Sequence, residues 1–207
     1  MLNIAVFASG RGSNLEALQH AISKREVEAK IAVVISNNSD AGALKLAQSF
    51  QIPAVHLSQK QFPTQEEFCH AVLKALESFG VQLIVLAGYM KKIDPAVIRK
   101  YRDRIINIHP ALLPSFGGKG MYGRRVHEAV ISSGATITGA TVHIVDEKYD
   151  HGPVVLQESI PVLPHDTPDS LAERVLQVEH TILPKAVRLF AEGKIKIHHN
   201  RVDLTSS

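Results

Sequence analysis

The chain has 207 residues, of which 45% are hydrophobic and 21% are charged. This length and composition predict one compact domain with a buried core, and they exclude a disordered chain, a collagen-like repeat and a coiled coil. With 23 Lys and Arg residues against 20 Asp and Glu residues, the net charge is only +3. We therefore expect no nucleic-acid partner, because binding to phosphates by bulk charge needs a strongly basic surface.

Signals for a membrane or secretory destination are weak. The longest apolar runs, such as 31–35 and 83–87, are much shorter than the roughly 20 residues that a membrane helix needs. Met1 leads directly into a strand-like segment, without the basic stretch of a secretory signal. Cys69 is the only cysteine, and its helical context favours a small buried side chain over a reactive thiol. We expect a cytoplasmic protein without a membrane partner.

Short apolar segments in the first half of the chain are predicted strands, at 3–8, 30–36, 54–56, 83–87 and 105–108. Most are apolar throughout, which is typical of strands covered on both faces. Stretches with helical periodicity separate them. This alternation predicts right-handed crossovers and an α/β fold, with an open, mostly parallel twisted sheet and helices on both faces.

Two helix starts are marked by capping residues. Thr64 and Glu67 have the spacing of a capping box, and Gly80 follows the end of the same helical pattern. Asp94 followed by Pro95 has the pattern of an N-cap with proline at the first helical position.

The pattern changes after about residue 135. Segments 138–146 and 154–161 are predicted to pair as a hairpin, so the C-terminal strands are partly antiparallel. A long helix is predicted from 168 to about 192, followed by a short strand at 195–198. We expect 202–207 to be a frayed tail.

A glycine-rich turn, Ser9–Asn14, follows the first strand and opens the first helix. It matches a dinucleotide fingerprint only in part, because Leu15 stands at the third glycine position and the second strand ends without a ribose-binding acid. Backbone N–H groups at a helix start suit a single phosphate. An ordinary strand-to-helix turn is the alternative.

A second polar group follows another predicted parallel strand. Asn107 and His109 are two residues apart, so both leave the same face of an extended segment, and Pro110 keeps His109 out of the helical region. An amide beside an imidazole can stabilise the oxyanion of acyl transfer. A hydrogen-bonded structural histidine is the alternative.

The turn 146–153 contains further candidates. Acidic residues before Gly-Pro are common in solvated turns. A metal site from His143, Asp146, Asp150 and His151 matches no standard zinc or calcium spacing, so we expect no metal.

Glu179 lies at the border of the apolar stripe of the last helix. A carboxylate in that position is either paired, bound to a polar ligand or part of a solvated flank.

Taken together, these segments resemble the folate-dependent formyltransferases, and among them the phosphoribosylglycinamide formyltransferase family. The resemblance covers nearly the whole chain, in the family's order. Its motifs are SGRGSNLEAL (Ser9–Leu18), VLAGYMKKI (Val85–Ile93), NIHPALLP (Asn107–Pro114), GATVHIVDEKYDHGPVVLQ (Gly139–Gln157) and RVLQVEH (Arg174–His180).

The resemblance implies a formyltransferase fold and a reaction of de novo purine biosynthesis. The formyl group of 10-formyltetrahydrofolate passes to the amine of N1-(5-phospho-β-D-ribosyl)glycinamide, and tetrahydrofolate is released. It also implies one domain over 1–207, with a phosphate-binding half at 1–100 and a catalytic and folate half at 101–200. The implied partners are these two small molecules, and the chain is expected to be a monomer or a homodimer.

The family's functional residues carry over onto matching positions. The implied catalytic trio is Asn107, His109 and Asp150. The ribonucleotide phosphate would be held by Gly12, Ser13 and Asn14, and its ribose by Glu179. The folate would be bound by Met90, Lys91, Lys92 and Ile93, together with Asn107.

The implied mechanism follows from charge that grows on the formyl oxygen. Protonated His109 and the Asn107 amide donate to that oxygen. Asp150 raises the pKa of His109 and guides a water that moves the proton from the attacking amine to the folate nitrogen. No metal is required.

Some positions depart from the family pattern. Lys91 and Gln65 stand where relatives often have arginine, so contacts to the folate are open. The stretch 116–125 is either a flap over the folate or a surface loop, and we favour the loop. His143 is expected to be a hydrogen-bonded strand histidine, with a place near the catalytic cleft as the alternative.

Three other functions share part of these features. A formyltetrahydrofolate hydrolase has the same catalytic segments, but its relatives carry an extra N-terminal domain for which a start at Met1 leaves no room. A sugar-phosphate sensor needs the phosphate loop without the trio. A nicotinamide-dependent oxidoreductase is disfavoured by Leu15 and the missing acid.

Overall fold

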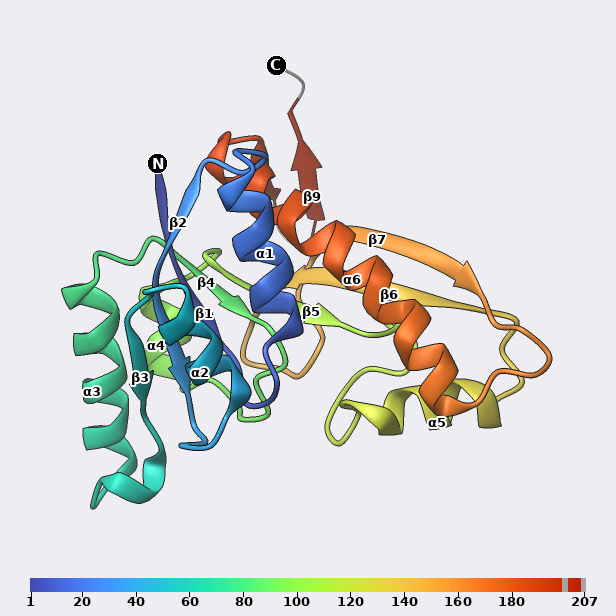
Figure 1. Cartoon of the computed structure of the whole chain (residues 1–207), viewed down its shortest axis with the longest axis horizontal. Coiled ribbons are helices and arrows are strands. Elements are labelled where there is room, and N and C mark those ends of the chain that lie inside the picture. Colours follow the sequence, from blue (N-terminus) through green and yellow to red (C-terminus); the bar gives the residue numbers. More distant parts are fainter. Residues whose placement is uncertain (199–200, 206–207) are drawn as a thin grey trace. The chain divides into compact units, whose positions relative to one another are not determined.

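The computed structural model describes residues 1–198 and 201–205. The chain divides into two compact units, Met1–Ile106 and Asn107–Ser207. Figure 1 labels the elements along the chain.

The first unit is built on parallel strands in the order β3-β2-β1-β4. Their bounds are β1 Leu2–Phe7, β2 Ala29–Ser36, β3 Ala54–His56 and β4 Leu83–Leu86. β5, Ile105–His109, begins beside β4, where the Ile84 N–H donates to the Arg104 carbonyl. The apolar segments predicted as strands are therefore confirmed within a residue or two. β1, β2 and β4 are almost fully buried, as strands covered on both faces should be.

The helices of the first unit cover both faces of these strands. They are α1 Ser13–Ser23, α2 Gly42–Ser49, α3 Gln65–Ser78 and α4 Pro95–Lys100, with a short 3₁₀ turn η1 at Gln59–Gln61. α1 contacts α2, and α3 contacts α4. The chain moves outward from β1 to β3 and then back to β4, so right-handed crossovers place the two helix pairs on opposite faces. The predicted α/β class is confirmed.

The two predicted helix starts are also confirmed. The Thr64 hydroxyl accepts the Glu67 N–H at 3.2 Å at the start of α3. The Asp94 carboxylate accepts the Ala96 N–H at 2.8 Å at the start of α4, and proline follows it as predicted. Cys69 is buried on α3, and burial raises the pKa of its thiol to about 11. A small unreactive side chain is thus the right description of this cysteine.

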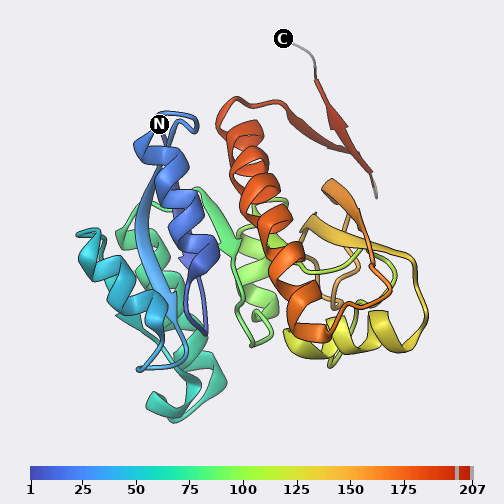
Figure 2. The same cartoon turned by 45° about the vertical axis from the view of Figure 1, so that its right-hand side comes forward.

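The second unit continues from the end of β5 through β6, which pairs antiparallel with β7. Its elements are α5 Arg124–Ser132, β6 Ile137–Ile144, β7 Val154–Pro161, α6 Pro168–Ala191, β8 Ile195–His198 and β9 Arg201–Leu204. α6 packs along β6 and β7 and against α5 (Figure 2). The predicted hairpin and long helix are confirmed. Within the described part of the chain, no helix is long and apolar enough to span a membrane.

The prediction of a frayed C-terminal tail is wrong for its described part. Residues 201–204 form β9, which pairs antiparallel with β8. Ile195 lies opposite Leu204, and Ile197 lies opposite Val202. These apolar cross-strand pairs lie on one side of the two strands, and the alternation of apolar and polar residues in 195–198 and 201–204 is the sequence signal for them. Residues 206 and 207 lie outside the described residues.

Candidate active site

The end of β5 presents the two polar residues that the sequence singled out. Ile106 and Ile108 alternate with Asn107 and His109 along the extended strand, so the polar pair shares one face. The His109 side chain is buried, with only 3% of the residue exposed. A titratable ring that is shielded from bulk water at the carboxyl end of a strand is a candidate for acid–base or hydrogen-bond catalysis.

Asp150 completes a compact cluster in the second unit. It follows β6 in the turn to β7, where its φ of +51° points its carboxylate inward. One oxygen, Oδ2, lies 3.8 Å from His109 Nδ1, and the other, Oδ1, lies 3.6 Å from His143 Nε2. The Gly118 N–H donates to Oδ2 at 2.9 Å. The structure therefore brings Asn107, His109 and Asp150 together around one carboxylate.

His143 links Asn107 to this carboxylate. Its Nδ1 lies 2.8 Å from the Ile144 carbonyl, which can only accept, so this nitrogen carries a proton. In the neutral ring, Nε2 is then an acceptor, and it lies 3.1 Å from Asn107 Nδ2. This contact holds the Asn107 amide with its NH₂ group toward the ring and leaves one amide hydrogen for another acceptor. His143 is thus a hydrogen-bonded histidine on β6, as expected, and it also lies beside Asp150, close to the candidate catalytic residues.

Two opposing effects set the pKa of His109. Burial lowers its pKa below the ordinary value, and this outweighs the raising effects of Asp150 and of the Phe116 carbonyl. The contribution of Asp150 has the predicted sign, but the net shift is downward. His109 Nε2 lies 2.9 Å from the Phe116 carbonyl, so the neutral ring carries its proton on Nε2.

Asp150 is held in its ionised form. Burial would raise its pKa, but the neighbouring rings of His143 and His109 and the Gly118 N–H lower it, so the net shift is downward. The cluster thus combines an ionised carboxylate with an imidazole whose conjugate acid is stronger than usual.

Glycine allows the turn after Asp150 to approach β6 closely. A Cβ added at Gly152 would lie 2.0 Å from the Ile144 carbonyl oxygen. The Ile144 N–H in turn donates to the Pro153 carbonyl at 2.9 Å. Any side chain at this position would push the turn away from the strand and move the carboxylate with it.

The segment after His109 is tied to the hairpin by a buried hydroxyl. Thr141 Oγ1 donates to the Ala111 carbonyl at 2.6 Å and accepts the Leu113 N–H at 3.1 Å. Gln157 Nε2 donates to the same hydroxyl oxygen at 2.8 Å and to the Leu113 carbonyl at 3.0 Å. β6 and β7 therefore fix the segment that follows β5.

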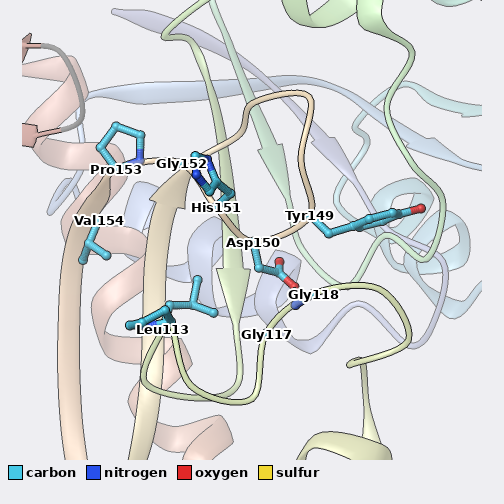
Figure 3. Close-up of a pocket in the computed structure, with 10 residues that line it drawn as sticks. Leu113, Gly117, Gly118, Tyr149, Asp150, His151, Gly152, Pro153 and Val154 are labelled. Atoms are coloured by element: carbon cyan, nitrogen blue, oxygen red, sulfur yellow. Dashed lines mark hydrogen bonds between the residues drawn. The ribbon is translucent and has the colours of Figure 1, made fainter.

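A pocket of about 390 Å³ opens beside Asp150. It is lined by Leu113, Pro114, Gly117, Gly118, Tyr149, Asp150, His151, Gly152, Pro153 and Val154. Figure 3 shows the Asp150 carboxylate turned toward Gly118, and the Tyr149 ring extending away from Pro153 and Val154. Apolar walls around one carboxylate are typical of a small-molecule site. Among the described residues, no group of three or more His, Cys, Asp or Glu side chains is arranged to hold a metal ion.

The glycine-rich turn in the first unit has the geometry of a phosphate cradle. Gly12 caps α1 with φ +90°, and a Cβ there would lie 2.9 Å from Ala43 Cα. Ser13 and the buried Asn14 form the first turn of α1, where backbone N–H groups have no intrahelical acceptor. The Ala43 N–H donates to the Gly10 carbonyl at 3.0 Å and holds the turn against α2.

The segment Met90–Ile93 lies after β4 in the same unit. Met90 is 49% exposed, and Ile93 is buried. Lys91 and Lys92 are exposed between them. The buried Ile93 anchors the end of an otherwise accessible segment. Gln65 Nε2 donates to Asp94 Oδ2 at 2.8 Å, so this glutamine supports the residue that follows the segment.

Two further polar residues of the second unit are buried. Glu179 on α6 is only 9% exposed, which excludes the solvated-flank alternative. The sequence analysis missed His127, which is buried on α5 and whose pKa is lowered by burial and by the charge of His109. His127 lies between Val126 and Val130 on an amphipathic helix, and this pattern does not distinguish a functional histidine from a core histidine.

Comparisons with known proteins agree with this geometry. The family described as formyl transferase matches residues 2–187. The chloroplastic phosphoribosylglycinamide formyltransferase of Arabidopsis thaliana is 39% identical over 202 residues, which cover 97% of this chain and 69% of the plant protein. The solved structure of glycinamide ribonucleotide transformylase 1 from Symbiobacterium toebii is 37% identical, with a TM-score of 0.94 over 100% of this chain and 95% of that chain.

A formyltetrahydrofolate deformylase is a more distant neighbour. The solved structure of the deformylase from Pseudomonas syringae is 26% identical to this chain, with a TM-score of 0.89 over 99% of this chain and 66% of the deformylase chain. The fold is therefore shared by enzymes with different named activities, while the higher identity lies with the transferases.

Proposed function

The chain belongs to the formyl transferase family, and from this membership we propose that it transfers the formyl group of 10-formyltetrahydrofolate to the amine of N1-(5-phospho-β-D-ribosyl)glycinamide. It is a formyl-transferring enzyme of purine biosynthesis, and its substrates are small molecules. One observation carries the proposal. The Asp150 carboxylate lies within 4 Å of both His109 and His143, and His143 holds Asn107, so one partly buried group links the trio.

The proposed catalytic step is attack of the substrate amine on the formyl carbon. Negative charge develops on the formyl oxygen, and the free hydrogen of the Asn107 amide is positioned to donate to it. An oriented donor of this kind is worth about 3 kcal/mol of transition-state stabilisation. His143 supports this role because its Nε2 fixes the other half of the amide.

His109 supplies the second donor. The hydrogen on Nε2 is shared with the Phe116 carbonyl in this structure, and the formyl oxygen would take over as its acceptor. Phe116 has a φ of +55°, an unfavourable conformation for a bulky residue. Because burial lowers its pKa, the imidazolium of His109 would be a stronger acid than usual, and hence a strong hydrogen-bond donor to that oxygen.

Asp150 assists the proton transfer from the attacking amine. Its separation of 3.8 Å from His109 Nδ1 is too long for a direct hydrogen bond and suits a bridging water. An ionised carboxylate can orient such a water so that the amine proton passes to the departing folate nitrogen. This scheme uses donors and acceptors of the protein and assigns no step to a metal.

The two substrates are assigned to separate loops. The backbone N–H groups of Gly12, Ser13 and Asn14 would hold the phosphate at the start of α1. Met90, Lys91, Lys92 and Ile93 would bind the folate, together with Asn107. Glu179, buried on α6, would accept hydrogen bonds from the ribose hydroxyls. A cytoplasmic location and a monomeric or homodimeric state complete the proposal.

The direct test is an assay of formyl transfer with the purified protein. Production of tetrahydrofolate from 10-formyltetrahydrofolate is followed with and without the ribonucleotide. The proposal predicts that tetrahydrofolate forms only when the ribonucleotide is present, in equal amount with the formylated product. Equal release without the ribonucleotide would assign the chain to the hydrolases, the second candidate function.

A further inference from the structure

The hydroxyl of Ser9 joins the ends of three neighbouring strands in the first unit. Ser9 follows β1, Asn37 follows β2, and Met90 lies in the loop after β4. Ser9 Oγ lies 2.5 Å from Asn37 Oδ1, and the Met90 N–H donates to the same Oγ at 2.8 Å. β2, β1 and β4 are adjacent in the sheet, so one side chain bridges all three strand ends.

The direction of each hydrogen bond follows from the donor inventory. The Met90 N–H can only donate, so the Ser9 oxygen must accept there. The single hydroxyl hydrogen is then donated to Asn37 Oδ1. Asn37 therefore sets the rotation of the hydroxyl, and the hydroxyl in turn holds the backbone of Met90. Removing the Asn37 side chain leaves the Ser9 hydroxyl without its acceptor, and removing the Ser9 side chain leaves the Met90 N–H without its acceptor.

The linked segments are those assigned to the two substrates. Ser9 directly precedes the glycine turn at 10–14, which is held on its far side by the bond from Ala43 to Gly10. Met90 opens the segment assigned to the folate. Backbone bonds between β1 and the β4 loop end with the Ser9 N–H, which donates to the Gly88 carbonyl at 3.0 Å. Beyond Gly88, whose φ is +74°, the Ser9 side chain continues the connection.

We propose that Ser9 is a positioning residue that holds the folate segment at Met90 in register with the phosphate turn, with Asn37 orienting its hydroxyl. The inference rests on the proposed function, because that function assigns the two loops their substrates. Binding of either substrate orders one end of the same hydrogen-bond chain, so each substrate should strengthen the binding of the other.

The test measures binding separately from turnover. Calorimetric titrations give the Kd of tetrahydrofolate and of the ribonucleotide for the wild-type protein, for Ser9→Ala and for Asn37→Ala. For Ser9→Ala we expect the Kd of tetrahydrofolate to rise roughly 5- to 10-fold, the loss from one unpaired hydrogen-bonding group. The Kd of the ribonucleotide should change less than about twofold, because the turn keeps its backbone donors and its bond to α2. Asn37→Ala should show the same pattern with a smaller effect.

Two variants serve as controls. Ser9→Thr keeps the hydroxyl and should restore tetrahydrofolate binding. Ser36→Ala removes a hydroxyl from the end of β2 that accepts the Asn38 N–H at 3.1 Å and has no bond to Met90, so its tetrahydrofolate affinity should equal that of wild type. The backbone amide of Met90 should also exchange hydrogen faster in Ser9→Ala than in Ser36→Ala.

The outcomes separate this inference from the proposed function. An unchanged Kd of tetrahydrofolate in Ser9→Ala would overturn it, as would an equal loss of affinity for both ligands. A failure of the proposed function would appear in the wild-type protein as absence of formyl transfer, while these titrations would still report on the hydroxyl.

Discussion

The two units differ in the kind of group that the proposed function assigns to each. In the second unit, the groups assigned to the chemistry are buried or partly buried side chains brought together from β5, β6 and the turn before β7. In the first unit, the groups assigned to binding lie on two continuous loops, where a glycine turn offers backbone donors and a lysine-containing segment is exposed. Burial lowers the pKa of His109 in one region, and under the proposed function backbone shape would control recognition in the other. Substitutions should therefore affect turnover and affinity separately.

The largest effect should come from removing the imidazole of the catalytic cluster. His109→Ala is expected to lower kcat by roughly 10²- to 10³-fold, because a donor to the developing oxyanion is lost. The Kd of the ribonucleotide should stay within about twofold of wild type, since the phosphate turn belongs to the other region. Steady-state kinetics and calorimetry measure the two quantities. Near-normal turnover would remove His109 from the mechanism.

A negative charge in the turn assigned to the phosphate should weaken ribonucleotide binding and leave turnover nearly unchanged. Ser13→Asp places a carboxylate at the start of α1 and should raise the KM for the ribonucleotide by roughly 10- to 100-fold, with a small change in kcat. Ser23→Asp, at the other end of the same helix, is the matched control. An unchanged KM in Ser13→Asp would reject the assignment of the phosphate to this turn.

A smaller loss is expected when Asn107 loses the group that orients it. His143→Phe keeps an aromatic ring but removes the acceptor at Nε2, and kcat should fall about tenfold while the KM values stay within about threefold. His165→Phe, an exposed position of the same unit, should behave like wild type. Equal kcat values for both variants would contradict the positioning role of His143.

The finest test concerns the acidity of His109. Burial lowers its pKa and Asp150 raises it, so Asp150→Asn should lower the pKa further. The imidazolium should then persist to higher pH in wild type than in the variant. A titration followed by NMR of the ring gives both values directly. A pKa that rises in Asp150→Asn, or does not move, would break the pairing of the two residues.

Much of the fold follows from local sequence. Unbroken apolar runs identified the buried strands, and Thr64 and Asp94 marked two helix starts because a cap depends on neighbouring residues alone. The β8–β9 hairpin was missed because two four-residue strands give a weak alternation next to a chain end. The glycine turn before α1 could be located for the same local reason as the caps.

The cluster was harder to predict because its properties depend on contacts between distant residues. Asn107 and Asp150 are named by family motifs, but the bond between Asn107 and His143 is visible only after β5 and β6 lie together. The net pKa of His109 required the degree of burial, which the sequence around Pro110 does not give. The hydrogen-bond partner of His109 Nε2 is the Phe116 carbonyl, a backbone group that is present in every residue and so cannot be predicted from residue type.

The most direct test of the account is the single-turnover rate of formyl transfer in Asp150→Asn. With both substrates saturating, this rate reports the chemical step without binding or product release. We expect it to fall by at least about 10²-fold, while the Kd of the ribonucleotide stays near the wild-type value. A single-turnover rate close to wild type would contradict the claim that the Asp150 carboxylate organises the reaction.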